Sequence, residues 1–169
     1  TTAVNDGQWH HVAVVWDYSS GTSGTGKIYV DGVNDTSSST YAANNEYKSG
    51  DTLKIGRPNY GEAPNHFSGE IDEVRIWDKA RTETEIQDTI YATLKVNESN
   101  LVAYYNFNDD SVEGNVISNV STNKSLSFDG SNDYVNLNNS VVGLAKNDFT
   151  LEAWIKTTGT REAIIVKND

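Results

Sequence analysis

The most constraining feature of the chain is the stretch of residues 67–77, FSGEIDEVRIW. Two adjacent carboxylates, Asp72 and Glu73, lie within it, and hydrophobic and polar residues then alternate over residues 74–76. Alternation with a period of two is typical of a β-strand that has one buried face. Residues 78–86 break the alternation and predict the start of a helix. The chain is therefore expected to place a half-buried strand directly before a short helix.

Several other segments have the composition of short strands separated by turn residues. Residues 9–16, WHHVAVVW, are apolar on both faces, which predicts an inner strand of a sandwich. Asp31-Gly32 predicts a hairpin turn after a strand at residues 27–30. Residues 18–26 are expected to form a flexible loop, and residues 36–45 a polar surface excursion. Further strands are expected at residues 52–56, 101–107, 125–137, 149–158 and 163–167.

One short surface helix is expected at residues 82–94. Thr82 can cap its N-terminus, and Glu85 three residues later completes a capping box. Ile86, Ile90 and Leu94 recur at helical spacing and give the helix one apolar face. That face is sufficient for the helix to pack on a sheet.

Four motifs in the first half of the chain support a family resemblance. They are GQWHHV at residues 7–12, GKIYVDG at 26–32, LKIG at 53–56 and the stretch at 67–77. In this order they resemble the C-terminal half of a bacterial laminin-G-like domain of the concanavalin A-like superfamily. The resemblance implies an all-β fold, an antiparallel β-sandwich of the jelly-roll type with one short surface helix.

The second half of the chain resembles the opening strands of the same type of domain. Residues 1–95 therefore correspond to the C-terminal half of one unit, and residues 96–169 to the N-terminal half of the next, or permuted same, unit. We favour a cut across two tandem repeats over a permuted single unit. The family normally has further strands between these halves, and their absence would leave strand edges that need a neighbour.

Composition excludes several classes of function. The chain of 169 residues contains no Cys, which excludes disulfides, thiolate metal sites and a cysteine nucleophile. Its net charge of −11 argues against nucleic acid as a partner. No apolar run approaches ~18 residues, so membrane insertion is not expected.

Calcium is the metal that the sequence favours, in a structural role. It prefers carboxylate, amide and carbonyl oxygens, and residues 128–134, FDGSNDY, form an oxygen-rich turn. The family resemblance implies that this turn lies near the closing strand, which carries Asp72. The predicted ligands are Asp72, Asp129, Asn132 and Asp133. The alternative is an ordinary hairpin turn rich in Asp and Asn.

Aromatic residues near strand ends and loops are the candidates for ligand binding. The fold uses rim loops or exposed aromatic rings, which stack on sugars. Trp16, Tyr18 and Tyr60 are the selected candidates, with Tyr104 and Tyr105 as weaker ones. Trp9, Trp77 and Trp154 lie in alternating strands and are expected in the core.

Catalysis is not expected. Glu70 and Asp72 share one face of a strand, as two carboxylates of a glycosidase would, but the surrounding residues resemble a non-catalytic closing strand. His10 and His11 point to opposite faces and cannot bind one ion, so His11 is expected to pack beside Trp9 with its ring hydrogen-bonded. No serine lies in a Gly-x-Ser-x-Gly elbow.

The sequence therefore predicts a non-catalytic recognition or adhesion module of a large secreted or cell-surface repeat protein. Its expected partners are a glycan or an extracellular protein, together with neighbouring repeats. The first alternative is a structural building block of an extracellular filament or stalk. The weaker alternative is a domain like a glycoside hydrolase.

Overall fold

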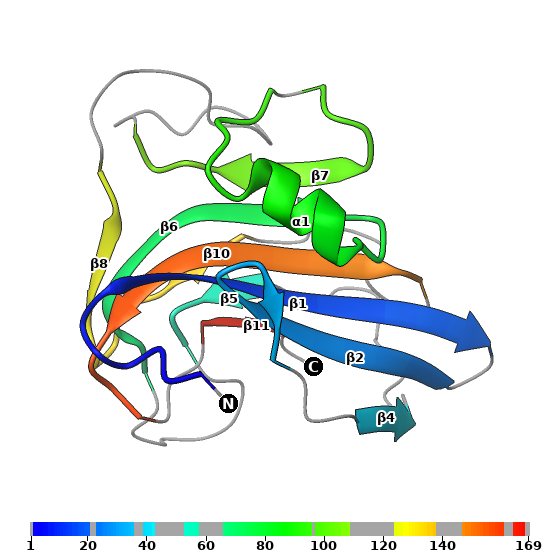
Figure 1. Cartoon of the computed structure of the whole chain (residues 1–169). Helices are drawn as coiled ribbons and strands as arrows, with labels where there is room; N and C mark the ends of the chain where they lie inside the picture. Colours follow the sequence, from blue (N-terminus) through cyan, green and yellow to red (C-terminus); the bar gives the residue numbers. More distant parts are fainter. Residues whose placement is uncertain are drawn as a thin grey trace.

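Two antiparallel β-sheets face each other in the computed structural model of the chain (Figure 1). The structure describes residues 2–20, 23–35, 39–42, 53–57, 66–95, 97–108, 124–137, 147–160 and 164–167. Within these residues the strands are β1 (Trp9–Ser20), β2 (Ser23–Val30), β3 (Val33–Asn34), β4 (Ser39–Ala42), β5 (Leu53–Ile55), β6 (Ser68–Trp77), β7 (Leu101–Tyr105), β8 (Leu126–Asp129), β9 (Val135–Asn136), β10 (Phe149–Thr157) and β11 (Ile165–Lys167). The helix is α1 (Glu83–Thr89). The predicted fold class is confirmed.

The large sheet has the strand order β3-β2-β1-β10-β6-β7, with β4 paired to β2 and β8 paired to β6. The small sheet has the order β11-β5-β9. β10 lies between β1 and β6, with Trp9 opposite Lys156 on one side and Asp72 opposite Trp154 on the other. Strands from the two halves of the sequence therefore alternate within one sheet.

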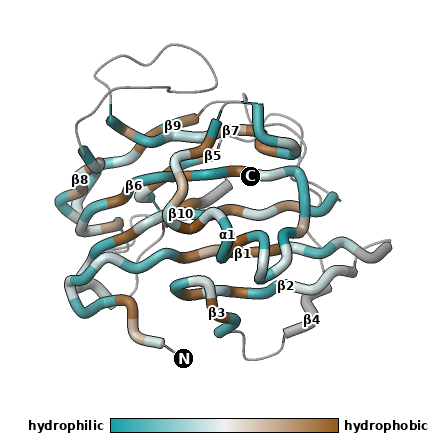
Figure 2. The backbone as a smooth tube through the Cα atoms, turned by 45° about the horizontal axis from the view of Figure 1, so that its top comes forward, coloured by the Kyte–Doolittle hydropathy of each residue, from teal (hydrophilic) through white to brown (hydrophobic). Residues whose placement is uncertain are grey.

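The main hydrophobic core fills the space between the two sheets. β6 contributes Ile71, Val74 and Ile76, all at 0% exposure. β10 contributes Ala153 and Ile155, and the small sheet contributes Leu53, Ile55 and part-buried Val135 and Ile165. Hydrophobic and hydrophilic positions alternate along the central strands of the large sheet (Figure 2), as burial of one face requires.

A β-bulge interrupts the regular alternation of β6. The register with β10 shifts between Glu152 and Trp154, and Glu73 has a φ of 53°. This left-handed backbone is uncommon for a residue other than glycine. The bulge explains why the core residues Ile71 and Val74 are three positions apart instead of two.

Helix α1 packs on the outer face of the large sheet, opposite the small sheet (Figure 1). Ile86 packs against Ala13, Val15 and Tyr29 of β1 and β2. The predicted capping box is confirmed, because Thr82 accepts a hydrogen bond from the Glu85 backbone and the Glu85 side chain accepts one from the Thr82 backbone. Among the described residues no helix is long and apolar enough to cross a membrane.

The predicted helix was too long. It ends at Thr89, and Leu94 lies beyond it, where it is buried against Trp77 and Tyr104. The helix can end at Thr89 because Arg75 of β6 donates hydrogen bonds from its guanidinium group to the backbone carbonyls of Thr89 and Ala92. These carbonyls therefore have partners without a further helical turn.

The predicted loop at residues 18–26 is also wrong for most of its length. β1 continues to Ser20 and β2 begins at Ser23, so the two strands form a long hairpin. The side chain of Trp16 lies across Gly24, where a Cβ atom would approach within 2.4 Å of the indole ring. Gly24 therefore permits close packing of Trp16 against β2, within a segment that the sequence predicted to be a loop.

Candidate functional site

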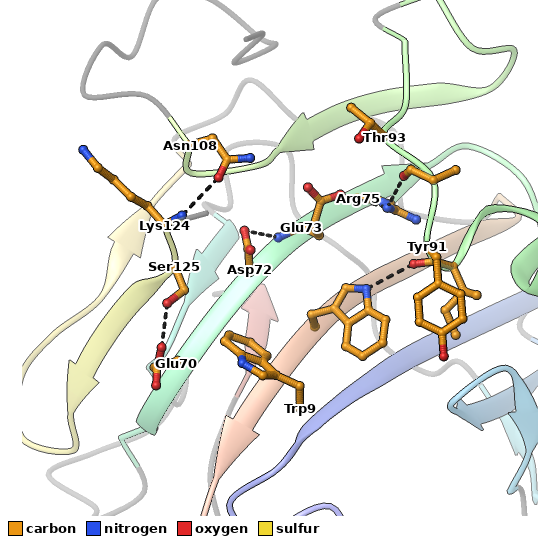
Figure 3. Close-up of a pocket in the computed structure, with 13 residues that line it drawn as sticks. Trp9, Glu70, Asp72, Glu73, Arg75, Tyr91, Thr93, Asn108, Lys124 and Ser125 are labelled. Atoms are coloured by element: carbon orange, nitrogen blue, oxygen red, sulfur yellow. Dashed lines mark hydrogen bonds and ion pairs between the residues drawn. The ribbon is translucent and has the colours of Figure 1, made fainter. Parts of the chain in front are cut away.

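A groove with a volume of about 500 Å³ lies on the α1 side of the large sheet. Its floor is formed by β6 and β10, and the start of β1 borders it. Residues 90–93 after α1, Asn108 after β7 and residues 124–125 before β8 form the walls. Figure 3 shows Glu70, Asp72 and Glu73 following one another along β6, with Trp9 and Tyr91 beside them.

The bulge places four successive polar side chains of β6 in this groove: Glu70, Asp72, Glu73 and Arg75. Without the extra residue, Asp72 and Glu73 would point to opposite faces of the sheet. Asp72 accepts a hydrogen bond of 2.7 Å from the backbone N–H of Glu73. The expected shared face of Glu70 and Asp72 is confirmed, and the bulge adds Glu73 to it.

The environments of two of these carboxylates shift their pKa values in opposite directions. The pKa of Glu70 is lowered by hydrogen bonds from Lys156, at 2.9 Å, and from Ser125, at 2.8 Å. Burial raises the pKa of Asp72 to about 7, and the nearby charge of Glu73 adds to this effect. The groove therefore keeps Glu70 ionised at neutral pH and disfavours ionisation of Asp72.

The third carboxylate, Glu73, is held by two partners. Arg75 donates a hydrogen bond of 2.8 Å to its Oε2 atom, and the Tyr104 hydroxyl donates one of 2.6 Å to the same atom. Burial raises the pKa of Tyr104, so the phenol remains a hydrogen-bond donor. Tyr104 is buried, as is Tyr105, and both are corrected from ligand-binding candidates to core residues.

A buried ionic network lies beside the groove, beneath α1. Glu152 is 1% exposed, and its Oε1 atom accepts a hydrogen bond of 2.5 Å from Arg81 Nη1. Its Oε2 atom lies 3.8 Å from Arg75 Nη1 and 3.7 Å from His11 Nε2. Burial raises the pKa of Glu152, but the contacts with His11 and Arg81 more than offset it, and the pKa is lowered overall. The network therefore holds Glu152 as a buried anion.

The same two arginines fix α1 and the segment after it over the sheet. Besides its bonds to the carbonyls of Thr89 and Ala92, Arg75 lies with its guanidinium group above the Tyr104 ring. Arg81 donates to the backbone carbonyl of Glu85 and to the Thr89 hydroxyl, and it lies 4.0 Å from the centre of the Trp77 ring. Cations at the C-terminal end of a helix are also favoured by its dipole.

Three aromatic side chains line the groove: Trp9 from β1, Trp154 from β10 and Tyr91 from the segment after α1. Trp9 is 38% exposed and Tyr91 is 83% exposed. The rings of Tyr91 and Trp154 are 5.6 Å apart, and Trp154 Nε1 donates a hydrogen bond of 3.2 Å to the carbonyl of Ile90. The core assignment is therefore wrong for Trp9 and holds for Trp77, which is 5% exposed.

The ligand-binding residues predicted from the sequence do not line this groove. Trp16 lies at the other end of β1, opposite Phe149 and Gly26, and is half-buried. The backbone N–H of Tyr18 donates a hydrogen bond of 2.8 Å to Asp148. Tyr60 lies outside the described residues. Their role in binding stays a prediction.

The predicted calcium ligands fall into two places. Asp129 and Asp133 belong to one turn, in which Asp133 accepts from the backbone N–H of Asp129 and Asp129 accepts from that of Ser131. Asp129 pairs with Ser68, four positions before Asp72 on β6, so the structure does not bring Asp72 into this turn. Asn132 is exposed in the same turn.

This turn has the donor types that calcium prefers, since it offers two carboxylates and an amide. Among the described residues, however, no group of three or more His, Asp or Glu side chains is arranged to hold a metal ion. Calcium at Asp129, Asn132 and Asp133 therefore stays a prediction, with any further ligands coming from backbone carbonyls or water.

The expectation for His11 needs correction. It packs edge-to-face on Trp154, with ring centres 5.6 Å apart, and not beside Trp9. Within the described residues neither ring nitrogen has a hydrogen-bond partner, although Glu152 lies 3.7 Å from Nε2. His11 is 1% exposed and belongs to the buried ionic network.

Sequence reasoning missed Trp9, Tyr91 and Trp154 as residues of the site. One signal was available for the acidic side of the groove, because the three-residue spacing of Ile71 and Val74 indicates a bulge. No local signal identified the aromatic side. Its three members come from separate segments, which only the pairing of β1 with β10 and the return of the chain after α1 bring together.

Comparison with known proteins agrees with this architecture. The concanavalin A-like lectin/glucanases superfamily, in its laminin G form, matches residues 1–87 of the chain. The chain belongs to this superfamily. The matched residues include β1 and β6 and end within α1, so they cover Trp9 and the β6 side of the groove but not Tyr91 or Trp154.

Two relatives extend the comparison. Human neuronal pentraxin-1 is 27% identical over 106 residues, which is 60% of this chain and 24% of that protein. A rat protein named for sushi, von Willebrand factor type A, EGF and pentraxin domains is 32% identical over 81 residues, or 45% of this chain and 2% of that protein. The chain thus spans a quarter or less of the length of these relatives. No solved structure matches the chain.

Proposed function

We propose that the chain is a non-catalytic recognition module of a secreted or cell-surface protein, which binds a glycan or an extracellular protein. The observation that supports this most strongly is the groove on the α1 side of the large sheet. Its volume of about 500 Å³ is in the range of sites for small ligands. It combines exposed aromatic rings with carboxylates whose orientation is fixed by hydrogen bonds.

Membership of the superfamily is consistent with a binding role, but fold alone does not determine function. The contacts of Glu70 and Glu73 favour binding over hydrolysis at these two residues. Glu70 is held by Lys156 and Ser125, and Glu73 by Arg75 and Tyr104, so two of the three are already engaged as acceptors. A general acid or a nucleophile would need to be available to a substrate.

The test is to incubate the chain with immobilised glycans and with extracellular-matrix glycoproteins, and to measure retention and the integrity of the ligand. We expect saturable, reversible binding to at least one of them, with the ligand recovered uncleaved. Cleavage that disappears in Glu70→Gln or Asp72→Asn would instead support a glycoside hydrolase. Absence of binding to every ligand would contradict the proposal.

Calcium in a structural role at the Asp129 turn forms part of this proposal. Thermal unfolding in excess calcium and in EDTA tests it, because a ligand bound only to the native state raises stability. An increase in Tm that is lost in Asp129→Asn and kept in Asp72→Asn would support a site confined to the turn. Equal Tm values in calcium and EDTA would contradict it.

A second candidate is a structural building block of a repeat protein, and it depends on which repeat supplies β10. This strand comes from the second half of the sequence yet lies between β1 and β6 of the first half. In a tandem array the same place in the sheet can be filled by the β10 of a neighbouring repeat, as in domain swapping.

Sedimentation of the isolated chain distinguishes pairing of β10 within its own chain from pairing of β10 with a neighbouring repeat. A monomer with one cooperative unfolding transition would support pairing of β10 within the chain and a permuted unit. Dimers or open chains of subunits that exchange strands would support the array.

A further inference from the structure

The groove has an aromatic side whose composition points to a particular kind of ligand. Trp9 and Trp154 occupy diagonal positions on neighbouring strands, since Trp9 pairs with Lys156 and Trp154 pairs with His11. Tyr91 continues the row, with its ring 5.6 Å from that of Trp154. Aromatic rings bind surfaces made of C–H groups while their polar edges remain in water. A row of such rings suits an elongated ligand that has several flat apolar faces.

The opposite side of the groove offers hydrogen-bond acceptors. Asp72 pairs directly with Trp154 across β6 and β10, and Glu70 pairs with Lys156. Asp72 therefore lies opposite Trp154, and Glu70 is separated from Trp9 by Lys156 on the strand between them. Ser125 and Asn108 add hydroxyl and amide groups to the same wall. This side is suited to a ligand that carries several hydroxyl donors.

The charges within the groove are largely balanced. Glu70 forms an ion pair with Lys156 at 2.9 Å, and Glu73 forms one with Arg75 at 2.8 Å. Lys124 also lines the groove. A strongly charged ligand of either sign would therefore gain little from this site, despite the net charge of −11 on the whole chain.

We infer that this groove binds a segment of a neutral linear oligosaccharide, with sugar rings stacked on Trp9, Trp154 and Tyr91 and hydroxyl groups donating to the β6 carboxylates. This inference rests on the proposed function and specifies its ligand and its site. It places binding on the sheet face beneath the end of α1, and not at Trp16 and Tyr18 near the far end of β1.

The test uses the whole chain and a panel of neutral tetrasaccharides: cello-, laminari-, xylo-, manno- and chito-oligosaccharides. Heparin and polygalacturonate fragments provide acidic ligands. Saturation-transfer NMR identifies binders, and calorimetry measures Kd. We expect a neutral tetrasaccharide to bind more tightly than its monosaccharide, with a Kd that changes by less than about twofold between about 0.05 and 0.5 M salt.

Substitution of the exposed rings then locates the site. Trp9→Ala and Tyr91→Ala are each expected to raise Kd by about tenfold or more, because buried aromatic anchors dominate binding interfaces. Trp9→Phe and Tyr91→Phe should retain part of the affinity. Both positions are exposed, so the variants should fold, which circular dichroism and Tm can confirm.

A matched control removes an exposed aromatic ring elsewhere. Tyr134 is 44% exposed and lies next to β9 of the small sheet. Tyr134→Ala should leave Kd within about twofold of the wild-type value.

The outcomes separate this inference from the proposed function. If the wild-type chain binds a glycan and the Trp9 and Tyr91 variants bind it equally well, the groove is not the site, while the recognition function stands. Binding of acidic glycans alone, or of a protein alone, would likewise overturn the inference and keep the function. If the wild-type chain binds neither a glycan nor a protein, both fail.

Discussion

β6 and β10 each present two faces that differ in chemistry. Towards the small sheet they contribute Ile71, Val74, Ile76, Ala153 and Ile155, which form an apolar core of ordinary type. Towards α1 the same strands contribute the groove carboxylates and the buried network around Glu152. Apolar packing tolerates substitutions that conserve volume, whereas a buried ionic network requires every partner. Both faces therefore contribute to stability, the first through apolar burial and the second through ion pairs that also fix where α1 and the groove lie.

The largest effect is expected from removing the centre of the ionic network. Glu152→Ala leaves the buried cation Arg81 without its anion and removes one of the two anions beside Arg75, so it should destabilise the fold by about 3–5 kcal/mol in urea unfolding. Lys156→Ala on the same strand is the control. It breaks a solvent-exposed ion pair with Glu70, so its effect should be below about 1 kcal/mol. If Glu152→Ala and Lys156→Ala lower the free energy of unfolding equally, the buried network contributes no more to stability than an ion pair at the surface.

The apolar face is tested by truncating one side chain of β6. Ile76 is 0% exposed, and Ile76→Ala should lower the free energy of unfolding by about 2–5 kcal/mol through lost burial and a new cavity. Ile28→Ala serves as control, because Ile28 is 49% exposed on β2 and should change stability by less than about 0.5 kcal/mol. Ligand affinity at the groove should stay constant in Ile76→Ala at temperatures where the variant is folded. A selective loss of binding would show that the two faces are coupled.

Substitution of Asp72 should stabilise the chain at high pH, whereas truncation of a core residue destabilises it. The pKa of Asp72 is raised from an ordinary value of 3.8 to about 7 in the folded state, so the folded state binds more protons than the unfolded state between these two pH values. The favourable contribution of the neutral acid is therefore present in full below pH 3.8 and is lost as pH rises through about 7. Asp72→Asn cannot ionise and its amide oxygen can still accept from the Glu73 N–H. It should stabilise the chain by about 1–2 kcal/mol at pH 8 and have little effect near pH 4.

Glu70→Gln is the matched control for this pH dependence. The pKa of Glu70 is lowered, so its contribution to stability is present above its unfolded pKa and is lost as pH falls. The substitution should slightly destabilise the chain at pH 8. Chemical unfolding at several pH values distinguishes the two residues. Destabilisation by Asp72→Asn at pH 8 would contradict the assignment of Asp72 as a carboxylate that the fold disfavours in its ionised form.

The smallest predicted effect concerns the start of α1. Thr82→Ala removes the capping box with Glu85 and should destabilise the chain by about 1 kcal/mol. Thr82→Ser keeps the hydroxyl and should restore most of this loss. If Thr82→Ala changes Tm as much as Glu152→Ala does, the arginine contacts at the end of α1 are not its main attachment to the sheet.

The sequence by itself determined the elements whose signals are local. The alternation of residues 74–76 predicted the end of β6, Asp31-Gly32 predicted the β2–β3 hairpin, and Thr82 with Glu85 predicted the start of α1. These features depend on backbone geometry and on contacts between residues a few positions apart. The local amino-acid pattern is therefore sufficient to predict them.

Only the tertiary structure determined which residues are buried on the face of the large sheet that α1 covers. In its own segment Glu152 has the pattern of a solvent-facing residue of a half-buried strand, and so does Arg75. They are buried because β10 lies between β1 and β6, and because α1 covers that face. The same pairing places Trp154 opposite Asp72 and next to Trp9. Strand pairing between distant segments sets these neighbours, and a period of two cannot show which strand lies alongside or what covers the outer face.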